Sequence, residues 1–338
     1  MIKAVLAAMC FALLTVTARA GGIDDFNAAN EAAKKGQIED AIRLFTQALG
    51  AGDLSPADQL TAHKERGSEY ISSSLIADTF ERLDQARSLR EKAIADFSDA
   101  LKVKTDDTAT YVARGQAYDL NGQYDAAIAD FDAALKIKES PVTLIQRANS
   151  KTAKGDYDGA IADFNAALAL AGKDKDASIE PVDIYGARGY AQFIAARYAA
   201  AAADFAAALG AGATTRKGDV LWFPYHAAWL HIARARAGEN DADELARNAG
   251  VTDVKQWPGT LLAYFLGQTK IEDMAPASSH GGVGHARECG VAFFTAEDAL
   301  AKKDNGTASQ QLTRARAACN VHTIYYLAAG VELKRLGK

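Results

Sequence analysis

One short phrase recurs along the first two thirds of the chain, and this repetition constrains the fold more than any other feature. The phrase reads Ala-x-Ala-Asp-Phe-x-x-Ala-Leu, and its four copies begin at Ala93, Ala127, Ala160 and Ala201. A more divergent copy begins at Ala41. Within each copy the apolar positions fall at i, i+1, i+4, i+7 and i+8, which lie on one face of a helix. Each copy therefore predicts a helix that packs through this face.

A second helix is expected before each copy. Tyr111, Gly115 and Tyr118 precede the copy at Ala127, and a Gly-Gln-Tyr-Asp turn begins at Gly122. In such a turn the glycine ends one helix and the aspartate opens the next. The copy at Ala160 is preceded by the same order of residue types, at Leu144, Ala148, Gly155 and Tyr157. Because small residues let antiparallel helices approach closely, the repeating unit is predicted to be a helical hairpin.

The order Tyr or Leu, Gly, Tyr, Ala, Phe, Ala resembles the tetratricopeptide repeat (TPR), whose unit has about 34 residues. The two best copies start 33 residues apart, at Ala127 and Ala160. The resemblance implies an all-α fold, a TPR-like α-solenoid in which antiparallel hairpins form a right-handed superhelix. About five repeats would occupy residues 21–215.

Two segments depart from the regular spacing. A charged stretch around 75–90 is expected to lengthen the helices of the second unit, and a polar loop is expected at 171–178. The remaining divisions are a divergent helical region (216–275), a Gly/Ser/His-rich linker (276–287) and a final hairpin with a capping helix (288–338). Within them we expect helices at 222–237, 242–248, 257–266, 271–274, 288–302, 307–318 and 323–336.

The N-terminal twenty residues have the three-part form of a secretory signal peptide. Lys3 is followed by a mostly apolar run and then by Ala-Arg-Ala, so cleavage is expected between Ala20 and Gly21. The apolar run is shorter than the roughly 20 residues of a membrane-spanning helix. Lipidation at Cys10 is the alternative, but Met9 is too large for the usual lipoprotein cleavage site. We therefore expect a periplasmic or secreted protein with no membrane insertion after cleavage.

The charge balance argues against nucleic acid as a partner. The formal net charge of the 338 residues is −5. A mildly acidic protein is poorly suited to phosphate backbones or anionic membranes.

The last third of the chain is similar to a second family, the NlpI type of bacterial envelope TPR lipoprotein. The similarity rests on Trp257, Tyr264 to Gly267, Asn320 to His322, and Glu332-Leu333 with Leu336-Gly337. It implies an adaptor for cell-wall hydrolases and a periplasmic protease. Lipid anchoring is not carried over, because this chain lacks a convincing lipidation site.

Residue patterns typical of catalysis or metal binding are not found. His226 and His231 are five residues apart, whereas a zinc pair on a helix is spaced i, i+4. His280 and His285 flank glycines, and His322 is expected to cap or pack. The repeated aspartates are expected on one outer face about 10 Å apart, too far to share an ion. They would be solubilising or would pair with basic neighbours; they are Asp96, Asp130, Asp163 and Asp204. We predict no enzyme, no cofactor and no metal.

The TPR resemblance also implies a groove lined by the first helix of each unit. The corresponding residues are Lys64, Ser68, Ile71, Val112, Gln116, Asp119, Ile145, Asn149, Thr152, Asp183, Tyr190 and Phe193. Chaperone-binding TPRs carry an Asn where this chain has Ser68, so an acidic C-terminal tail is not the expected ligand. The apolar and amide-rich lining favours an extended peptide segment. The alternative is that some of these residues simply pack between helices.

These patterns leave three hypotheses about function. The first is a scaffold or adaptor that binds one or more envelope proteins. The second is a small-ligand or peptidoglycan-fragment binder, or an enzyme, with a pocket in the region 216–275 formed by Trp229, Trp257, Tyr264 and Phe265. Assembly into homo-oligomers through the ends of the solenoid is compatible with the first hypothesis.

A disulfide is predicted between Cys289 and Cys319. Each lies fifteen residues from Asp304, so pairing of antiparallel helices around a turn at Asp304 places the two cysteines level. The bond would stabilise the fold by about 3–4 kcal/mol in the chain-entropy model. Two separate buried thiols are the alternative. Mass spectrometry of the unreduced mature protein should find no free thiol, and a count of two would exclude the bond.

Overall fold

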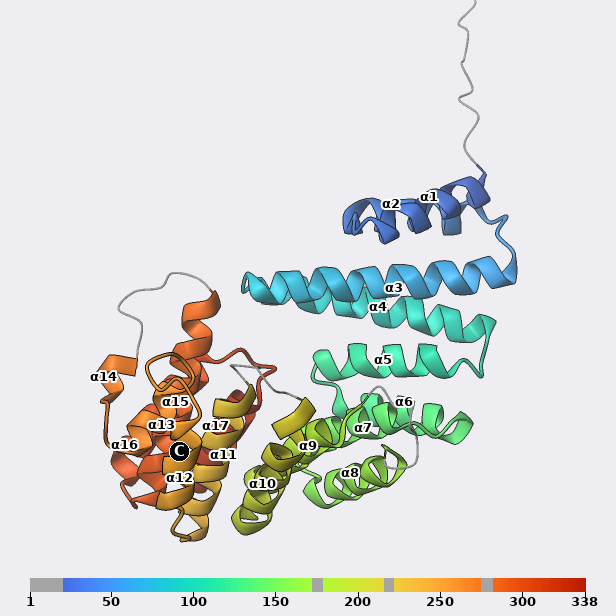
Figure 1. The fold of residues 1–338 in the computed structure, drawn as a ribbon. Helices are drawn as coiled ribbons and strands as arrows, with labels where there is room; N and C mark the ends of the chain where they lie inside the picture. The colour runs from blue at the N-terminus through green and yellow to red at the C-terminus, as the bar shows by residue number, and fades with distance from the viewer. Residues whose placement is uncertain (1–20, 172–178, 216–221, 275–281) are drawn as a thin grey trace, which may run out of the picture.

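The computed structural model describes residues 21–171, 179–215, 222–274 and 282–338, and these residues form helices without any β-strand. The predicted signal peptide, the polar loop and part of the linker lie outside this range. Figure 1 shows helical hairpins stacked one on another, followed by a separate group of C-terminal helices. This arrangement confirms the predicted all-α, TPR-like solenoid.

Five hairpins make up the stack, and each consists of two consecutive antiparallel helices. They are α1 (Gly22–Lys34) with α2 (Ile38–Ala51), α3 (Pro56–Thr79) with α4 (Leu83–Val103), α5 (Thr108–Leu120) with α6 (Tyr124–Ile137), α7 (Pro141–Lys154) with α8 (Tyr157–Ala171), and α9 (Pro181–Ile194) with α10 (Tyr198–Thr215). The second helix of each pair carries a copy of the repeated phrase.

Seven further helices follow the stack within the described residues. They are α11 (Trp222–Ala237), α12 (Ala242–Gly250), α13 (Thr260–Phe265), α14 (Ile271–Met274), α15 (Gly282–Ala301), α16 (Asn305–Ala318) and α17 (Ile324–Arg335). Helix α15 begins inside the range predicted to be a linker, six residues before the predicted hairpin. The glycines at 282 and 284 are therefore helical.

The core of the stack consists of the phenylalanines of the repeated phrase. Each is at most 2% exposed: Phe45, Phe97, Phe131, Phe164 and Phe205. The ring of Phe131 lies against Gly115, where an added Cβ would be 2.8 Å from the ring. The hairpin turn at Gly122 needs a positive φ of 72°, which glycine adopts without strain. Gly115 thus allows the two helices to approach closely, and Gly122 allows the turn between them.

The repeated aspartates are buried, which corrects the expectation of an outer face. Each is at most 6% exposed and is paired by an arginine of the first helix of its own unit. In the third unit Arg114 donates from Nε and Nη2 to the two carboxylate oxygens of Asp130, both at 2.8 Å. The same two-point pairs are Arg66–Asp96, Arg147–Asp163 and Arg188–Asp204. The expectation of basic partners is confirmed.

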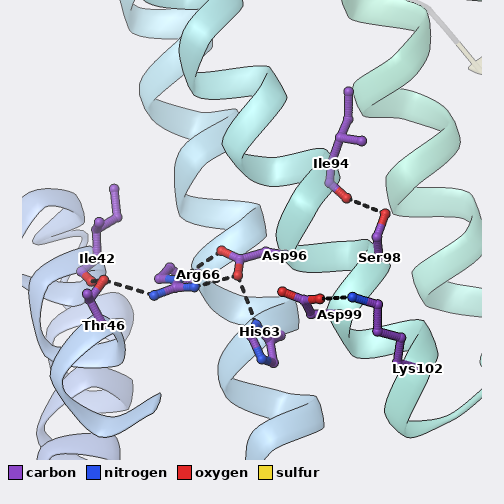
Figure 2. A network of polar contacts seen from close by, with 9 residues as sticks. All are labelled: Ile42, Thr46, His63, Arg66, Ile94, Asp96, Ser98, Asp99 and Lys102. Atoms are coloured by element: carbon purple, nitrogen blue, oxygen red, sulfur yellow. Dashed lines mark hydrogen bonds and ion pairs between the residues drawn. The ribbon is translucent and has the colours of Figure 1, made fainter. Parts of the chain in front are cut away.

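Each of these arginines also reaches back to the preceding hairpin. The third nitrogen of Arg114 donates to Ser98, the residue directly after the phenylalanine of the previous copy. Figure 2 shows the first such contact, in which Arg66 bridges Asp96 and Thr46. The others are Arg147 to Asp132 and Arg188 to Asn165. We call these four arginines, with their aspartates and their contacts on the preceding hairpin, the arginine ladder. It joins each unit internally and to its neighbour.

The second hairpin is longer than the others, as predicted. Its arginine and aspartate are 30 residues apart, against 16 in the three following units. The difference amounts to about four helical turns, two in each helix. Because whole turns are added, the ladder contact keeps its register. The extra length makes the tip of α3–α4 project past α5 toward the C-terminal helices (Figure 1).

The C-terminal helices share one apolar core with the last hairpin of the stack. Trp229 of α11 is fully buried, and the rings of Phe293 and Tyr325 lie 5.1 and 5.8 Å from its centre. The disulfide between Cys289 and Cys319 is present, with a Cα–Cα distance of 4.7 Å. No described helix is long and apolar enough to span a membrane.

The arginine ladder can be tested by removing one of its carboxylates. Asp130→Ala leaves the guanidinium of Arg114 largely buried without its partner, and we expect the free energy of unfolding to fall by about 2–4 kcal/mol. Replacing both residues, with Arg114→Met and Asp130→Leu, should restore much of this loss. The measurement is urea denaturation followed by circular dichroism.

Asp125→Ala provides a matched control, because Asp125 of α6 forms an ion pair with Lys154 but its side chain is 83% exposed. Its expected effect is below about 1 kcal/mol. Equal effects of Asp125→Ala and Asp130→Ala would show that the ladder does not stabilise the stack.

Candidate functional site

The predicted groove residues lie on α3, α5, α7 and α9, which are neighbours along the stack. Gln116, Asn149 and Asp183 are exposed, as is Ser68. They form a polar, partly amide surface on successive first helices, which is what the TPR resemblance implied for a peptide groove.

Three other predicted groove residues belong to the core. Phe193 is fully buried, and Thr152 is 5% exposed and donates its hydroxyl to the carbonyl of Ala148. The ring of Tyr190 lies 4.9 Å from that of Trp229. These residues therefore do not line an open groove. Trp229 of α11 packs on Tyr190 and Phe193 of the last hairpin, whereas Thr152 lies on α7, outside that hairpin.

The remaining groove residues have partners within the protein. Lys64 forms an ion pair with Asp107 at 2.8 Å, and Ile145 is half-buried against the apolar cluster of α7 and α8. Asp119 accepts a hydrogen bond from Ser150. Burial raises the pKa of the Asp119 carboxyl, while Ser150 and the nearby His322 oppose this rise. Fewer of the predicted residues are therefore free to contact a ligand than the TPR resemblance implied.

A cleft lies between the tip of the long hairpin and the C-terminal hairpin. Its volume is about 990 Å³. Asp78, Thr79, Glu81 and Leu83 line it on one side, and the other side includes Arg316, Tyr325, Tyr326 and both cysteines of the disulfide. The guanidinium of Arg316 stacks on the ring of Tyr326, 3.4 Å from its centre. The second hairpin of the stack and the C-terminal hairpin, which are far apart in the sequence, thus form one cleft.

Exposed apolar side chains lie at the α3–α4 tip beside this cleft, and two such residues, Leu83 and Val321, line it. Of the ten large apolar residues that are exposed in the described chain, four fall within nine positions of the α3–α4 tip: Leu75, Ile76, Phe80 and Leu83. Phe80 is 67% exposed. Val321, on the opposite side, is 45% exposed. We call these five residues the apolar rim. An apolar cluster of this kind at the edge of a cleft is typical of a binding surface.

Sequence reasoning did not identify the rim. The prediction for the segment around 75–90 rests on its charged residues and gives no role to the apolar residues among them. A signal was present, because Leu75, Ile76, Phe80 and Leu83 do not continue the repeated phrase and so have no assigned place in the core.

The aromatic residues of the region 216–275 mostly fill the core. Trp229 is fully buried, and the Nε1 of Trp257 donates to the hydroxyl of Tyr225 at 2.9 Å. Tyr264 donates its hydroxyl to Asp298 at 2.9 Å. Among the described residues of this region, only Tyr225 lines the cleft.

Two of the predicted structural histidines have clear partners. His231 lies 2.8 Å from Asp241, and His226 lies 2.9 Å from the carbonyl of Trp222. His280 lies outside the described residues.

A third histidine belongs to a group with metal-like geometry: His63, Asp96 and Asp99 place ligand atoms within 4.8 Å of one another. However, both oxygens of Asp96 accept from Arg66, and Asp99 pairs with Lys102 at 2.6 Å (Figure 2). The cations of Arg66 and Lys102 already neutralise these carboxylates, so the group is part of the arginine ladder.

A buried polar network fastens α17 to the stack. Glu297 is fully buried, and Arg236 donates to both Glu297 and Glu332. Burial raises the pKa of Glu297 to about 8, and Arg236 opposes the rise. Arg335 donates to Glu332 and to the carbonyl of Ile194 in α9. Arg335 therefore anchors α17 on the last hairpin.

Comparison with known proteins supports the TPR assignment. The family model of the tetratricopeptide repeat matches residues 108–141, which hold α5 and α6. No curated protein matches the sequence.

Solved structures are similar to most of the chain. A tetratricopeptide repeat protein from Parabacteroides merdae is 12% identical, with a TM-score of 0.55 over 92% of this chain and 98% of its own. The apo form of RapI is 12% identical, with a TM-score of 0.52 over 87% and 97% of the two chains. MamA is 16% identical over 58% and 94%, with a TM-score of 0.47. At these identities the likeness concerns the fold: the chain carries a tetratricopeptide repeat and folds as a TPR-like solenoid.

Proposed function

We propose that this protein is an exported scaffold that binds an extended segment of a partner protein in the cleft beside the α3–α4 tip and along the open part of the groove. The apolar rim is the observation that carries the proposal. A TPR-like solenoid is itself suited to protein–protein interaction. The rim adds apolar surface where the solenoid and the C-terminal helices face each other.

The chemistry of the two surfaces defines the segment that would fit. Leu83 and Val321 on the rim favour apolar side chains of the partner, and Tyr326 adds an aromatic surface. Gln116 and Asn149 offer amide groups, which can donate to and accept from an extended backbone. The proposed ligand is therefore an extended peptide with apolar anchors and not an acidic tail.

We place this scaffold in the bacterial periplasm. The N-terminal pattern of a signal peptide supports export, and a disulfide is suited to an oxidising compartment. The similarity of the last third to the NlpI type suggests envelope proteins as partners, such as cell-wall enzymes or a protease.

A second candidate is a binder of peptidoglycan fragments. It is favoured by the volume of the cleft, which is in the range of small-molecule sites, and by its tyrosines. Thermal-shift measurements with purified fragments would separate the two functions, because a ligand of the native state raises the melting temperature.

Site-specific photocrosslinking in living cells tests the scaffold. A photoreactive phenylalanine analogue at Phe80 should give discrete adducts with one or a few proteins, because Phe80 stands exposed on the rim. The adducts are measured by immunoblotting and identified by mass spectrometry.

The same analogue at Val251 serves as the control. Val251 is 75% exposed but follows α12, and it does not line the cleft. Adducts should be absent at this position, and Leu83→Ser should reduce those formed at Phe80 by several fold. Identical adducts at both positions, or none at either, would contradict the proposed binding surface.

Export is tested separately by expressing the full chain in a Gram-negative host. The periplasmic fraction should contain a protein whose intact mass corresponds to a start at Gly21, because cleavage is expected after Ala20. A cytoplasmic protein that retains residues 1–20 would refute the export proposal without bearing on the fold.

A further inference from the structure

A single histidine connects the long hairpin to the C-terminal helices at the edge of the cleft. His322 lies in the short loop between α16 and α17, and its Nε2 is 3.3 Å from Nη2 of Arg90 and 3.6 Å from a carboxylate oxygen of Asp78. Asp78 and Arg90 belong to α3 and α4 and form an ion pair with each other. The contact spans 232 positions in sequence.

The loop that carries His322 is held at both ends. Cys319 is fixed to α15 by the disulfide, and Thr323 caps α17 by accepting a hydrogen bond from the backbone N–H of Tyr326. Asn320 accepts from the N–H of His322 through its side chain. His322 is therefore presented to the long hairpin by a firmly anchored loop.

The contact requires a neutral imidazole. A guanidinium has only donors, so the Nε2 that faces Arg90 must accept and cannot carry a proton. Protonation would turn this acceptor into a donor and place a second cation beside Arg90. The carboxylates of Asp78 (α3) and Asp119 (α5) also face His322 and oppose this effect. Burial and Arg90 nevertheless lower the pKa of His322.

This polar contact joins the tip of the long hairpin to the C-terminal loop. Helices α3 and α4 pack chiefly on each other and on α2 and α5. The ion pair of Asp78 and Arg90 is about nine-tenths buried, yet Oδ1 of Asp78 and Nε of Arg90 have no hydrogen-bond partner. A buried ion pair with unpartnered atoms contributes little net stability.

Closure also covers part of the groove. Asp119, which the TPR resemblance places in the peptide groove, has His322 of the same chain close enough to shift the pKa of its carboxyl. Val321, the neighbour of His322, forms one side of the apolar rim. The loop before α17 therefore occupies space that a bound segment would need.

We propose that His322, Asp78, Arg90 and Asp119 form a pH-sensitive clasp. The clasp holds the tip of the α3–α4 hairpin against the C-terminal loop and opens when His322 is protonated.

The direction of the pH effect follows from proton linkage. A base whose pKa is lower in the closed state binds protons more tightly in the open state, so falling pH favours opening. The contribution of His322 to closure is full above the open-state pKa of about 6.5. It is lost as the pH falls through the lower pKa of the closed state. The His322 side chain is 31% exposed, so protons from the solvent can reach it.

The test measures the distance between the two halves of the clasp in the mature protein alone. Spin labels are attached at Gln85→Cys on α4 and Lys334→Cys on α17, two exposed positions, with the native disulfide intact. Double electron–electron resonance should show one closed distance at pH 7.5 and a growing population of longer distances toward pH 5.5. The open-to-closed ratio can change by at most about tenfold per pH unit for one proton.

His322→Gln is the matched variant, because its amide oxygen still accepts from Arg90 but cannot be protonated. It should stay closed at both pH values. An equal opening of the variant would assign the effect to another titratable group, such as Glu297, whose pKa burial raises to about 8. An unchanged distance in the wild type would overturn the clasp.

A measurement on the wild type alone guards against misfolding of the variant. NMR titration of the His322 ring, assigned through its backbone, should give a pKa below 6.5. A value at or above 6.5 would contradict the proposal, since the closed state would then not disfavour the proton. Opening concerns the chain itself, so this result is independent of whether a partner protein binds the cleft.

Discussion

The arginine ladder is the constraint on which the rest of the structure depends. Each arginine satisfies a buried carboxylate of its own hairpin with two parallel hydrogen bonds and reaches the preceding hairpin with its remaining nitrogen. A guanidinium can do this because its donors form a rigid planar fork, which a lysine ammonium lacks. The same group therefore fixes both the pairing of helices within a unit and the stacking of neighbouring units. An apolar core alone would allow small rotations between hairpins, since its contacts are not directional.

This directionality explains how the chain tolerates an unusually long second hairpin. Adding two turns to each helix preserves the faces that carry Arg66 and Asp96, so the contact forms as in the regular units. The added turns then have no neighbouring hairpin to cover them. Their apolar residues remain exposed, and Asp78 and Arg90 find their cover in the distant C-terminal loop. The cleft is thus a consequence of a length change that the ladder permits.

The repeated phrase was sufficient to predict the fold because its period and its small residues specify helical hairpins locally. The disulfide was also predictable, because antiparallel helices around one turn place Cys289 and Cys319 level. The arginine ladder was predicted only in part. The repeated aspartates were predicted to have basic partners, but Arg114 and its equivalents were not assigned as those partners. Their burial depends on how hairpins stack, which a single unit does not reveal.

The candidate site was less predictable for a different physical reason. Groove positions carried over from regular TPR arrays assume that every first helix faces open solvent. In this chain α11 and α17 cover α9, which buries Phe193 and places Tyr190 in the core, while the loop at His322 lies over Asp119. Both effects come from segments outside the repeats: Trp229 of α11 packs on Phe193, Arg335 of α17 reaches Ile194, and His322 reaches Arg90. A local pattern cannot encode such contacts, because the same helix sequence is compatible with either a covered or an open face.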